Sequence, residues 1–191
     1  GWVLVGAESV LRTTKRFDSR EHPTATGRPQ LQVDYVLPAA VVVSYSAGWN
    51  IVSLPLTPTQ NGVQALFPDA VSAFRFDAVY QPVTVLEPCV GYWLKLGSGG
   101  DYSLTGTPID QCSPALPASW SLVGVPQNGT RVDDISQNPA ANLASVFGFA
   151  GGYTPRSGQD LLQQGQGFWF HLGTPGQVTL NSDPGSAART V

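Results

Sequence analysis

The chain has 191 residues, and 42% of them are apolar, so it has enough apolar side chains to form a packed core. Only 12% are charged, about half the usual share, and the net charge of −3 leaves no basic surface of the kind that attracts nucleic acid. We therefore expect no nucleic-acid partner.

The 21 glycines and 16 prolines predict many turns and little helix. The apolar segments are short, rich in Val, Tyr, Phe and Trp, and separated by turn-forming residues, which is typical of an all-β fold. The longest apolar run, Ala39–Val43, is far below the about 20 residues of a membrane-spanning helix, so we expect no membrane insertion. The chain opens inside a strand-like pattern with neither Met nor a signal peptide, and we expect it to be a piece of a longer protein.

The first 38 residues differ in character from the rest of the chain. Their distinctive elements are Gly1-Trp2, the charged block Lys15-Arg16-Phe17-Asp18-Ser19-Arg20-Glu21, and Arg28-Pro29 before Leu31-Gln32-Val33-Asp34-Tyr35. Together these elements resemble the C-terminal end of the DNRLRE domains, a family of bacterial and archaeal extracellular jelly rolls, some of which bind polysaccharide. The resemblance implies that residues 1–38 are the terminal strands of a jelly-roll-like domain.

Such terminal strands cannot bury their inner face alone, because the remaining strands of the jelly roll would cover it. They need the absent part of the domain, the rest of this chain, or a neighbouring copy of the chain. We expect residues 39–47 to form a linker strand, and its run Ala39–Tyr45 suits strand addition to another copy. Head-to-tail assembly into a fibre is therefore one hypothesis.

Two copies of one repeat follow, recognised by motifs that recur in the same order. The motifs are Gly48-Trp49-Asn50-Ile51 and Ser119-Trp120-Ser121-Leu122, then Phe74-Arg75-Phe76 and Phe147-Gly148-Phe149, then Gly91-Tyr92-Trp93-Leu94 and Gly167-Phe168-Trp169-Phe170. They resemble the Gly-Trp-Asn and Gly-Tyr-Trp repeats found near the C-termini of large bacterial surface proteins. We place repeat 1 at residues 48–112, repeat 2 at 113–181 and a flexible tail at 182–191.

Four or five short strands leave much of their apolar face uncovered. We therefore expect two pseudo-symmetric repeats that share one core, either a closed barrel or a two-sheet sandwich. Within repeat 1, the glycine-rich loop 97–100 predicts a hairpin between the strand before it and the strand after it. A short helical turn is expected at residues 62–67.

Alternation along the last motif separates a core face from a partly solvated face. Tyr92 and Leu94 belong to the core face, whereas Trp93 lies on the other face with Lys95. In repeat 2 the equivalent of Trp93 is Trp169. These two tryptophans either pack the repeats against each other or present an aromatic platform to a ligand.

Cys89 and Cys112 are the only cysteines. We expect a disulfide between them, which implies an oxidising compartment and so an extracellular or cell-surface location. The alternative is two buried free thiols. Neither histidine, His22 nor His171, lies at metal-ligand spacing from the cysteines, so we expect no metal site.

The sequence contains no nucleophile elbow, phosphate loop or His-Glu-x-x-His motif, so we expect neither catalysis nor a cofactor. The first hypothesis is a non-catalytic extracellular structural or display module of a bacterial surface protein, with a self-assembling fibre as one form. The alternative is a carbohydrate-binding module in which Trp93, Trp169, Tyr80 and Tyr153 stack against sugar rings. Buried rings favour the structural hypothesis, and an exposed coplanar pair favours binding.

Overall fold

The structure is a computed structural model, which describes residues 21, 23–24, 38–183 and 185. The chain divides into a unit of residues 1–35 and a unit of residues 36–191, and the fold below is that of the second unit. The expected jelly-roll strands at residues 1–38 lie almost entirely outside the described residues.

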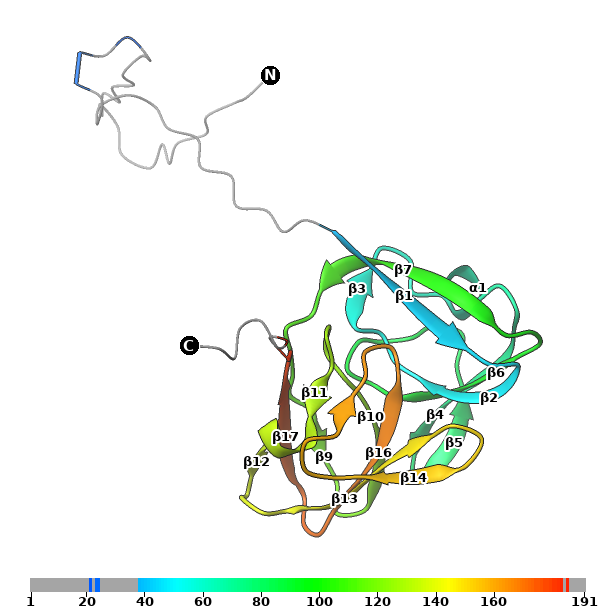
Figure 1. Cartoon of the computed structure of the whole chain (residues 1–191), viewed down its shortest axis with the longest axis vertical. Coiled ribbons are helices and arrows are strands. Elements are labelled where there is room, and N and C mark those ends of the chain that lie inside the picture. Colours follow the sequence, from blue (N-terminus) through cyan, green and yellow to red (C-terminus); the bar gives the residue numbers. More distant parts are fainter. Residues whose placement is uncertain (1–20, 22, 25–37, 184, 186–191) are drawn as a thin grey trace, which may run out of the picture. The chain divides into compact units, whose positions relative to one another are not determined.

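The described fold is all-β, as expected, with two short helical turns (Figure 1). The strands of the first half are β1 (Ala39–Tyr45), β2 (Gly48–Val52), β3 (Leu56–Pro58), β4 (Ala70–Asp77), β5 (Val79–Pro82), β6 (Tyr92–Leu96) and β7 (Gly100–Pro108). Those of the second half are β8 (Gln111–Cys112), β9 (Ala115–Leu116), β10 (Trp120–Gly124), β11 (Thr130–Arg131), β12 (Ser136–Asn138), β13 (Leu143–Phe149), β14 (Tyr153–Arg156), β15 (Leu161–Leu162), β16 (Gly167–Leu172) and β17 (Gly176–Asn181). The helix α1 (Val63–Leu66) confirms the turn expected at residues 62–67, and a 3-10 turn spans Val132–Asp134.

The strands form small antiparallel sheets in a propeller-like arrangement of four blades. Their strand orders are β1-β7-β3, β2-β6-β4-β5, β10-β16-β13-β14 and β12-β17-β8, with β9 also on β17 and a two-stranded sheet β11-β15. This arrangement replaces the single barrel or sandwich that we expected.

The glycine-rich loop 97–100 explains the difference, because it does not close a hairpin. Strand β6 before the loop pairs with β2 and β4, whereas β7 after it pairs with β1 and β3. In repeat 2, β16 and β17 likewise follow each other in sequence and belong to different sheets. The glycines favour a reversal of the chain, but they do not determine which strand the returning segment joins.

Two of the four-stranded sheets, β2-β6-β4-β5 and β10-β16-β13-β14, have corresponding strand orders and matching residue pairings. Trp49 lies opposite Lys95 in the first sheet, and Trp120 lies opposite His171 in the second. The other matching pairs are Ile51 with Trp93 and Leu122 with Trp169, Phe74 with Trp93 and Phe147 with Trp169, and Phe76 with Tyr80 and Phe149 with Tyr153. Residues that hold the same position in the two sheets, such as Trp93 and Trp169 or Lys95 and His171, are called equivalent below.

The buried side chains form two large clusters and one small one, where we had expected one shared core. Repeat 1 with β1 supplies the first cluster, which includes Leu94 from one sheet and Leu104 from another. Repeat 2 supplies almost all of the second, around Phe168 and Phe170. Side chains of β1 and β7 cluster with those of β6 and cover most of the apolar face of the first half. The first half therefore does not need a core shared with the second half. Tyr92 and Leu94 are buried, as the alternation predicts.

The two repeats meet where their backbones approach closely. The Gly91 N–H donates to the Leu122 carbonyl at 3.2 Å, and the Gly124 N–H donates to the Cys89 carbonyl at 3.0 Å. A Cβ on Gly167 would lie 2.7 Å from Ile51 Cγ2 and 3.1 Å from the Gly91 Cα. A side chain at position 167 does not fit at these distances, so the close contact between the repeats requires Gly167.

Candidate functional site

The expected disulfide between Cys89 and Cys112 is present. Cys112 is fully buried and pairs through β8 with Leu180 of β17, and Cys89 packs against the same cluster of side chains. The disulfide therefore ties the segment before β6 to the core of the second half.

The candidate residues Trp93 and Trp169 lie mainly inside the molecule. Trp169 is 7% exposed and Trp93 is half-buried. Trp93 meets Phe149 of the other repeat edge to face, with ring centroids 4.8 Å apart. Trp169 meets Phe76 in the same way at 4.9 Å. Of the two roles considered for these tryptophans, the packing of one repeat against the other is therefore observed.

The other two candidates, Tyr80 and Tyr153, lie on the outer strands β5 and β14 of the two matching sheets. Each follows a tight reversal, and each ring rests against the phenylalanine that faces it on the neighbouring strand. The centroid distances are 5.2 Å from Tyr80 to Phe76 and 5.5 Å from Tyr153 to Phe149. Each tyrosine ring thus packs against a phenylalanine on one side and is exposed to solvent on the other.

Two open pockets lie on this aromatic surface, with volumes of about 460 and 410 Å³. The first pocket is lined by Trp49, Phe74, Tyr80, Trp93 and Phe149. The second pocket is lined by Phe76, Tyr80, Trp120, Phe147, Tyr153 and Trp169. Apart from Tyr80 in the second pocket, the two linings consist of equivalent residues. Each pocket also takes at least one phenylalanine from the repeat that does not supply its tryptophans.

Trp49 and Trp120 are the site residues that the sequence analysis missed. They are the exposed tryptophans of the pockets, at 44% and 38%, beside Tyr80 at 54% and Tyr153 at 58%. Among the described residues, these four are the aromatic side chains classed as exposed, and all four line a pocket. A usable signal was present, because Trp49 and Trp120 recur in the first repeated motif.

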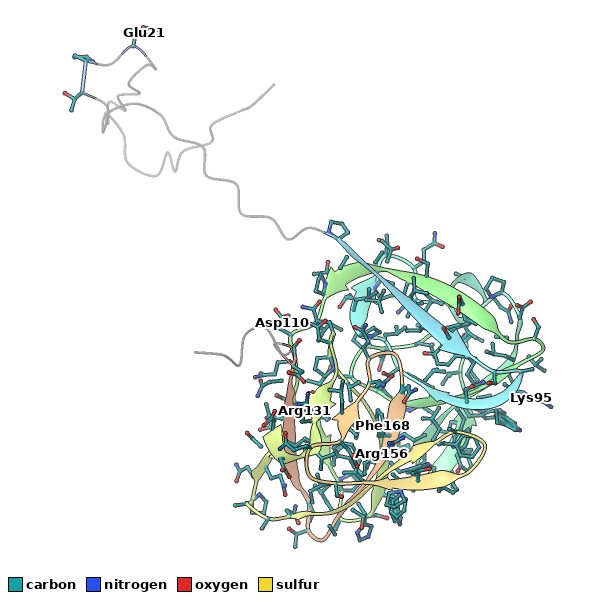
Figure 2. The ribbon with its side chains drawn as sticks, in the orientation of Figure 1. Glu21, Lys95, Asp110, Arg131, Arg156 and Phe168 are labelled. Carbon is teal, nitrogen blue, oxygen red and sulfur yellow. A yellow bond between two sulfur atoms is a disulfide. The ribbon has the colours of Figure 1, made fainter. Side chains whose placement is uncertain are left out.

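Polar groups lie around the aromatic rings. Lys95 points away from the fold (Figure 2), and its Nζ lies 5.8 Å from the Trp49 ring centroid. The equivalent residue His171 has its ring 4.8 Å from that of Trp120. The indole N–H groups of Trp93 and Trp169 are buried, and neither has a hydrogen-bond partner within the described part of the chain.

The Tyr153 phenol lies beside Tyr80 in the lining of the second pocket. Burial raises the pKa of the Tyr153 phenol, and the neighbouring Tyr80 raises it further.

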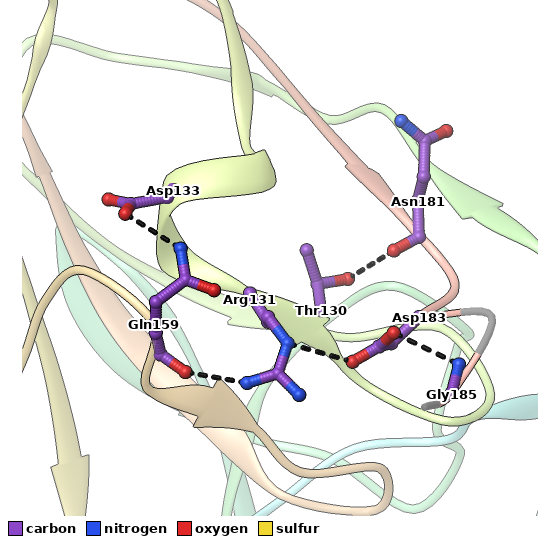
Figure 3. A network of polar contacts seen from close by, with 7 residues as sticks. All are labelled: Thr130, Arg131, Asp133, Gln159, Asn181, Asp183 and Gly185. Atoms are coloured by element: carbon purple, nitrogen blue, oxygen red, sulfur yellow. Dashed lines mark hydrogen bonds and ion pairs between the residues drawn. The ribbon is translucent and has the colours of Figure 1, made fainter. Parts of the chain in front are cut away.

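Outside the pockets, a network of polar contacts joins Arg131 to the last described residues of the chain. At the end of the described chain, Arg131 Nε lies 3.2 Å from Asp183 Oδ2 (Figure 3). The other contacts of this network are Arg131 Nη1 to the Gln159 carbonyl at 2.8 Å, Gln159 Nε2 to Asp133 Oδ2 at 2.9 Å, Thr130 Oγ1 to the Asn181 carbonyl at 2.8 Å and the Gly185 N–H to Asp183 Oδ1 at 3.0 Å. Asp183 is buried, so the first residues of the expected flexible tail are held in place.

Within the described ranges, no group of three or more His, Cys, Asp or Glu side chains is arranged to hold a metal ion. Those ranges also contain no helix that is long and apolar enough to cross a membrane. Comparison of the chain with models of protein families, with curated proteins and with solved structures finds no match.

Proposed function

We propose that this chain is a non-catalytic, extracellular binding module whose two aromatic pockets hold the sugar rings of a carbohydrate. The observation that carries the proposal is the position of the exposed aromatic side chains of the described fold, all of which line a pocket. Leaving large apolar rings in water is unfavourable, and a cluster of such rings at the surface marks a binding site.

The composition of the pockets suits a sugar. One face of a sugar ring carries C–H groups that pack on an aromatic ring, while hydroxyls surround its edge. The pockets offer tryptophan and tyrosine rings, and Lys95 Nζ is a donor beside the Trp49 ring of the first pocket. Volumes of about 460 and 410 Å³ lie within the usual range of small-ligand sites.

The proposal includes an approximate twofold relation between the repeats, which supplies two sites of one kind. It is supported by the reciprocal contacts Trp93 with Phe149 and Trp169 with Phe76, which exchange equivalent residues. The extracellular location is supported by the disulfide, because such bonds persist in oxidising compartments.

Isothermal titration with cellohexaose, xylohexaose and chitohexaose tests the proposal. We expect binding of at least one of these by the unchanged chain, and its weakening by at least tenfold in the double variant Trp49→Ala/Trp120→Ala. Val71→Ala is the matched control, because Val71 is an exposed apolar residue of β4 that lines neither pocket. If none of the hexaoses binds, or if the double variant binds as tightly as the control, the proposal is wrong.

A second candidate function is the structural or display module, with assembly into a fibre by strand addition. The run Ala39–Tyr45 pairs with β7 over its whole length and is an outer strand of its sheet. Its side chain Val42 is 64% exposed. A long outer strand of this kind is a template for another chain. Electron microscopy of concentrated protein, beside the variant Val42→Lys, tests this candidate: fibres that the substitution prevents support it, and monomers in both samples contradict it.

A further inference from the structure

We infer that the two pockets act as one continuous site, which binds a single polysaccharide chain across Tyr80 and Tyr153 and recognises the interior of that chain. The inference rests on the proposed function and goes beyond it, because carbohydrate binding by itself requires only one pocket or two independent ones.

The boundary between the pockets is built from side chains that belong to both. Tyr80 lines the first pocket and the second. Tyr153 lines the second pocket and at the same time contacts Trp93 of the first, with ring centroids 6.5 Å apart and planes at 86°. The boundary between the two pockets therefore consists of the tyrosine side chains.

The same boundary is accessible to a ligand. Tyr80 and Tyr153 are the most exposed aromatic side chains of the described fold. Both tyrosines line the second pocket, so each can offer its phenol to a ligand there. A ligand that passes from one pocket to the other can pack on these rings and bond these hydroxyls on its way.

The match between the linings identifies the kind of ligand. Trp49, Phe74 and Trp93 of the first pocket are repeated as Trp120, Phe147 and Trp169 in the second. The proposed twofold relation reverses the second pocket relative to a chain that has a direction, so the match applies to the packing of sugar ring faces on aromatic rings, which does not depend on that direction. Two pockets of the same residues therefore suit two units of the same kind, as in a polymer of repeating sugar units. Both pockets are open, and a chain can continue beyond each of them, which favours binding within a chain over binding at its end.

Joining two weak sites on one ligand raises affinity without any new contact, by a factor on the order of 10² to 10⁴ when the geometry allows both to be filled. A sugar too short to reach both pockets gains nothing from this effect. The length of the ligand is therefore the variable that separates one continuous site from two independent sites.

The experiment is isothermal titration of the full chain with cello-, xylo- and chito-oligosaccharides of one to six units. For the series that binds, we expect two short ligands per chain, then a change to one ligand per chain at the length that reaches both pockets, with at least tenfold tighter binding. In Trp49→Ala and in Trp120→Ala, we expect one short-ligand site to remain and the gain with length to disappear. Val71→Ala should behave as the unchanged chain.

The outcomes distinguish the inference from the proposed function. Two long ligands per chain, with affinity independent of length, overturn the continuous site and leave carbohydrate binding intact. An absence of binding at every length overturns both. A polyproline peptide is included as a further titrant, because aromatic grooves of other proteins hold such peptides. The inference is also overturned if this peptide binds in place of the sugars and its binding is lost in the Trp49→Ala/Trp120→Ala variant.

Discussion

Trp93 and Phe149 come from different repeats, and they meet edge to face with ring centroids 4.8 Å apart and planes at 72°. Their equivalents Trp169 and Phe76 repeat this contact at 4.9 Å and 74°. Each repeat thus inserts its central tryptophan against a phenylalanine of the other. Edge-to-face geometry is the favoured arrangement of aromatic pairs, so these contacts stabilise the join between the repeats as well as shaping both pockets.

Replacement of the inner tryptophan should weaken folding more than replacement of the outer one. Trp169 is almost fully buried between the repeats, and Trp169→Ala leaves a cavity there. We expect the free energy of unfolding to fall by about 3–5 kcal/mol, as for other buried aromatic residues. Chemical denaturation followed by fluorescence measures this loss. Trp120→Ala removes an exposed ring and is the matched control, and an equal loss in both variants would contradict the packing role.

The disulfide should contribute stability by limiting the unfolded chain. Cys89 and Cys112 are 23 residues apart, and a loop of that size gives about 3 kcal/mol in the chain-entropy treatment. The double variant Cys89→Ser/Cys112→Ser should therefore unfold at lower denaturant concentration than the oxidised protein. Adding a reductant should shift the unchanged chain toward the variant and leave the variant unaffected. A variant as stable as the oxidised protein would exclude this contribution.

Gly167→Ala tests the close approach of the repeats. The added Cβ would lie 2.7 Å from Ile51 Cγ2 and 2.9 Å from the Val52 carbonyl oxygen, so the neighbouring backbone must shift. We expect a loss of about 1–3 kcal/mol in the free energy of unfolding, typical of overpacking. Gly100→Ala is the control, since a Cβ there meets no atom within 4 Å. The expectation fails if the two variants melt at the same temperature.

Tyr45 should make stability depend on pH in the alkaline range. Its hydroxyl donates to the Gly165 carbonyl, and burial raises its pKa above the ordinary value of 10.0. The folded state therefore keeps the proton at a pH where the unfolded state releases it. Stability from this group is fully present below about pH 10 and decreases as the pH rises above that value.

Unfolding curves between pH 8 and 11 measure this dependence, with Tyr45→Phe as the comparison. The phenylalanine variant has no proton to lose at this position, so its stability should fall less steeply above about pH 10. Parallel pH profiles for the two proteins would contradict the assignment to Tyr45, since other tyrosines with raised pKa values, such as Tyr92 and Tyr102, remain in both.

Several local features could be predicted from the sequence because they depend on nearby residues or on pairing chemistry. Alternation predicted that Tyr92 and Leu94 are buried, and the presence of only two cysteines predicted the disulfide. The short helical turn before Pro68 was also found. Each of these needs only the local pattern or one pair of reactive groups.

The features that were not predicted depend on which sheet a strand joins. The loop 97–100 predicts a turn equally well for a hairpin and for a crossing between sheets. Trp169 was expected on a partly solvated face, but the other repeat covers that face. Trp49 was overlooked as a site residue although it contacts Phe74 and Trp93 of its own repeat, because its exposure is set by the folded arrangement and not by the repeated motif.

Phe149 completes the first pocket, and Phe76 contributes to the second, although each belongs to the opposite repeat. Neither repeat alone therefore forms a complete pocket. A chain shortened to one repeat would present an unfinished aromatic surface to water, so such a fragment is expected to pair with itself or to aggregate. Any binding that needs a complete pocket therefore belongs to the two repeats together.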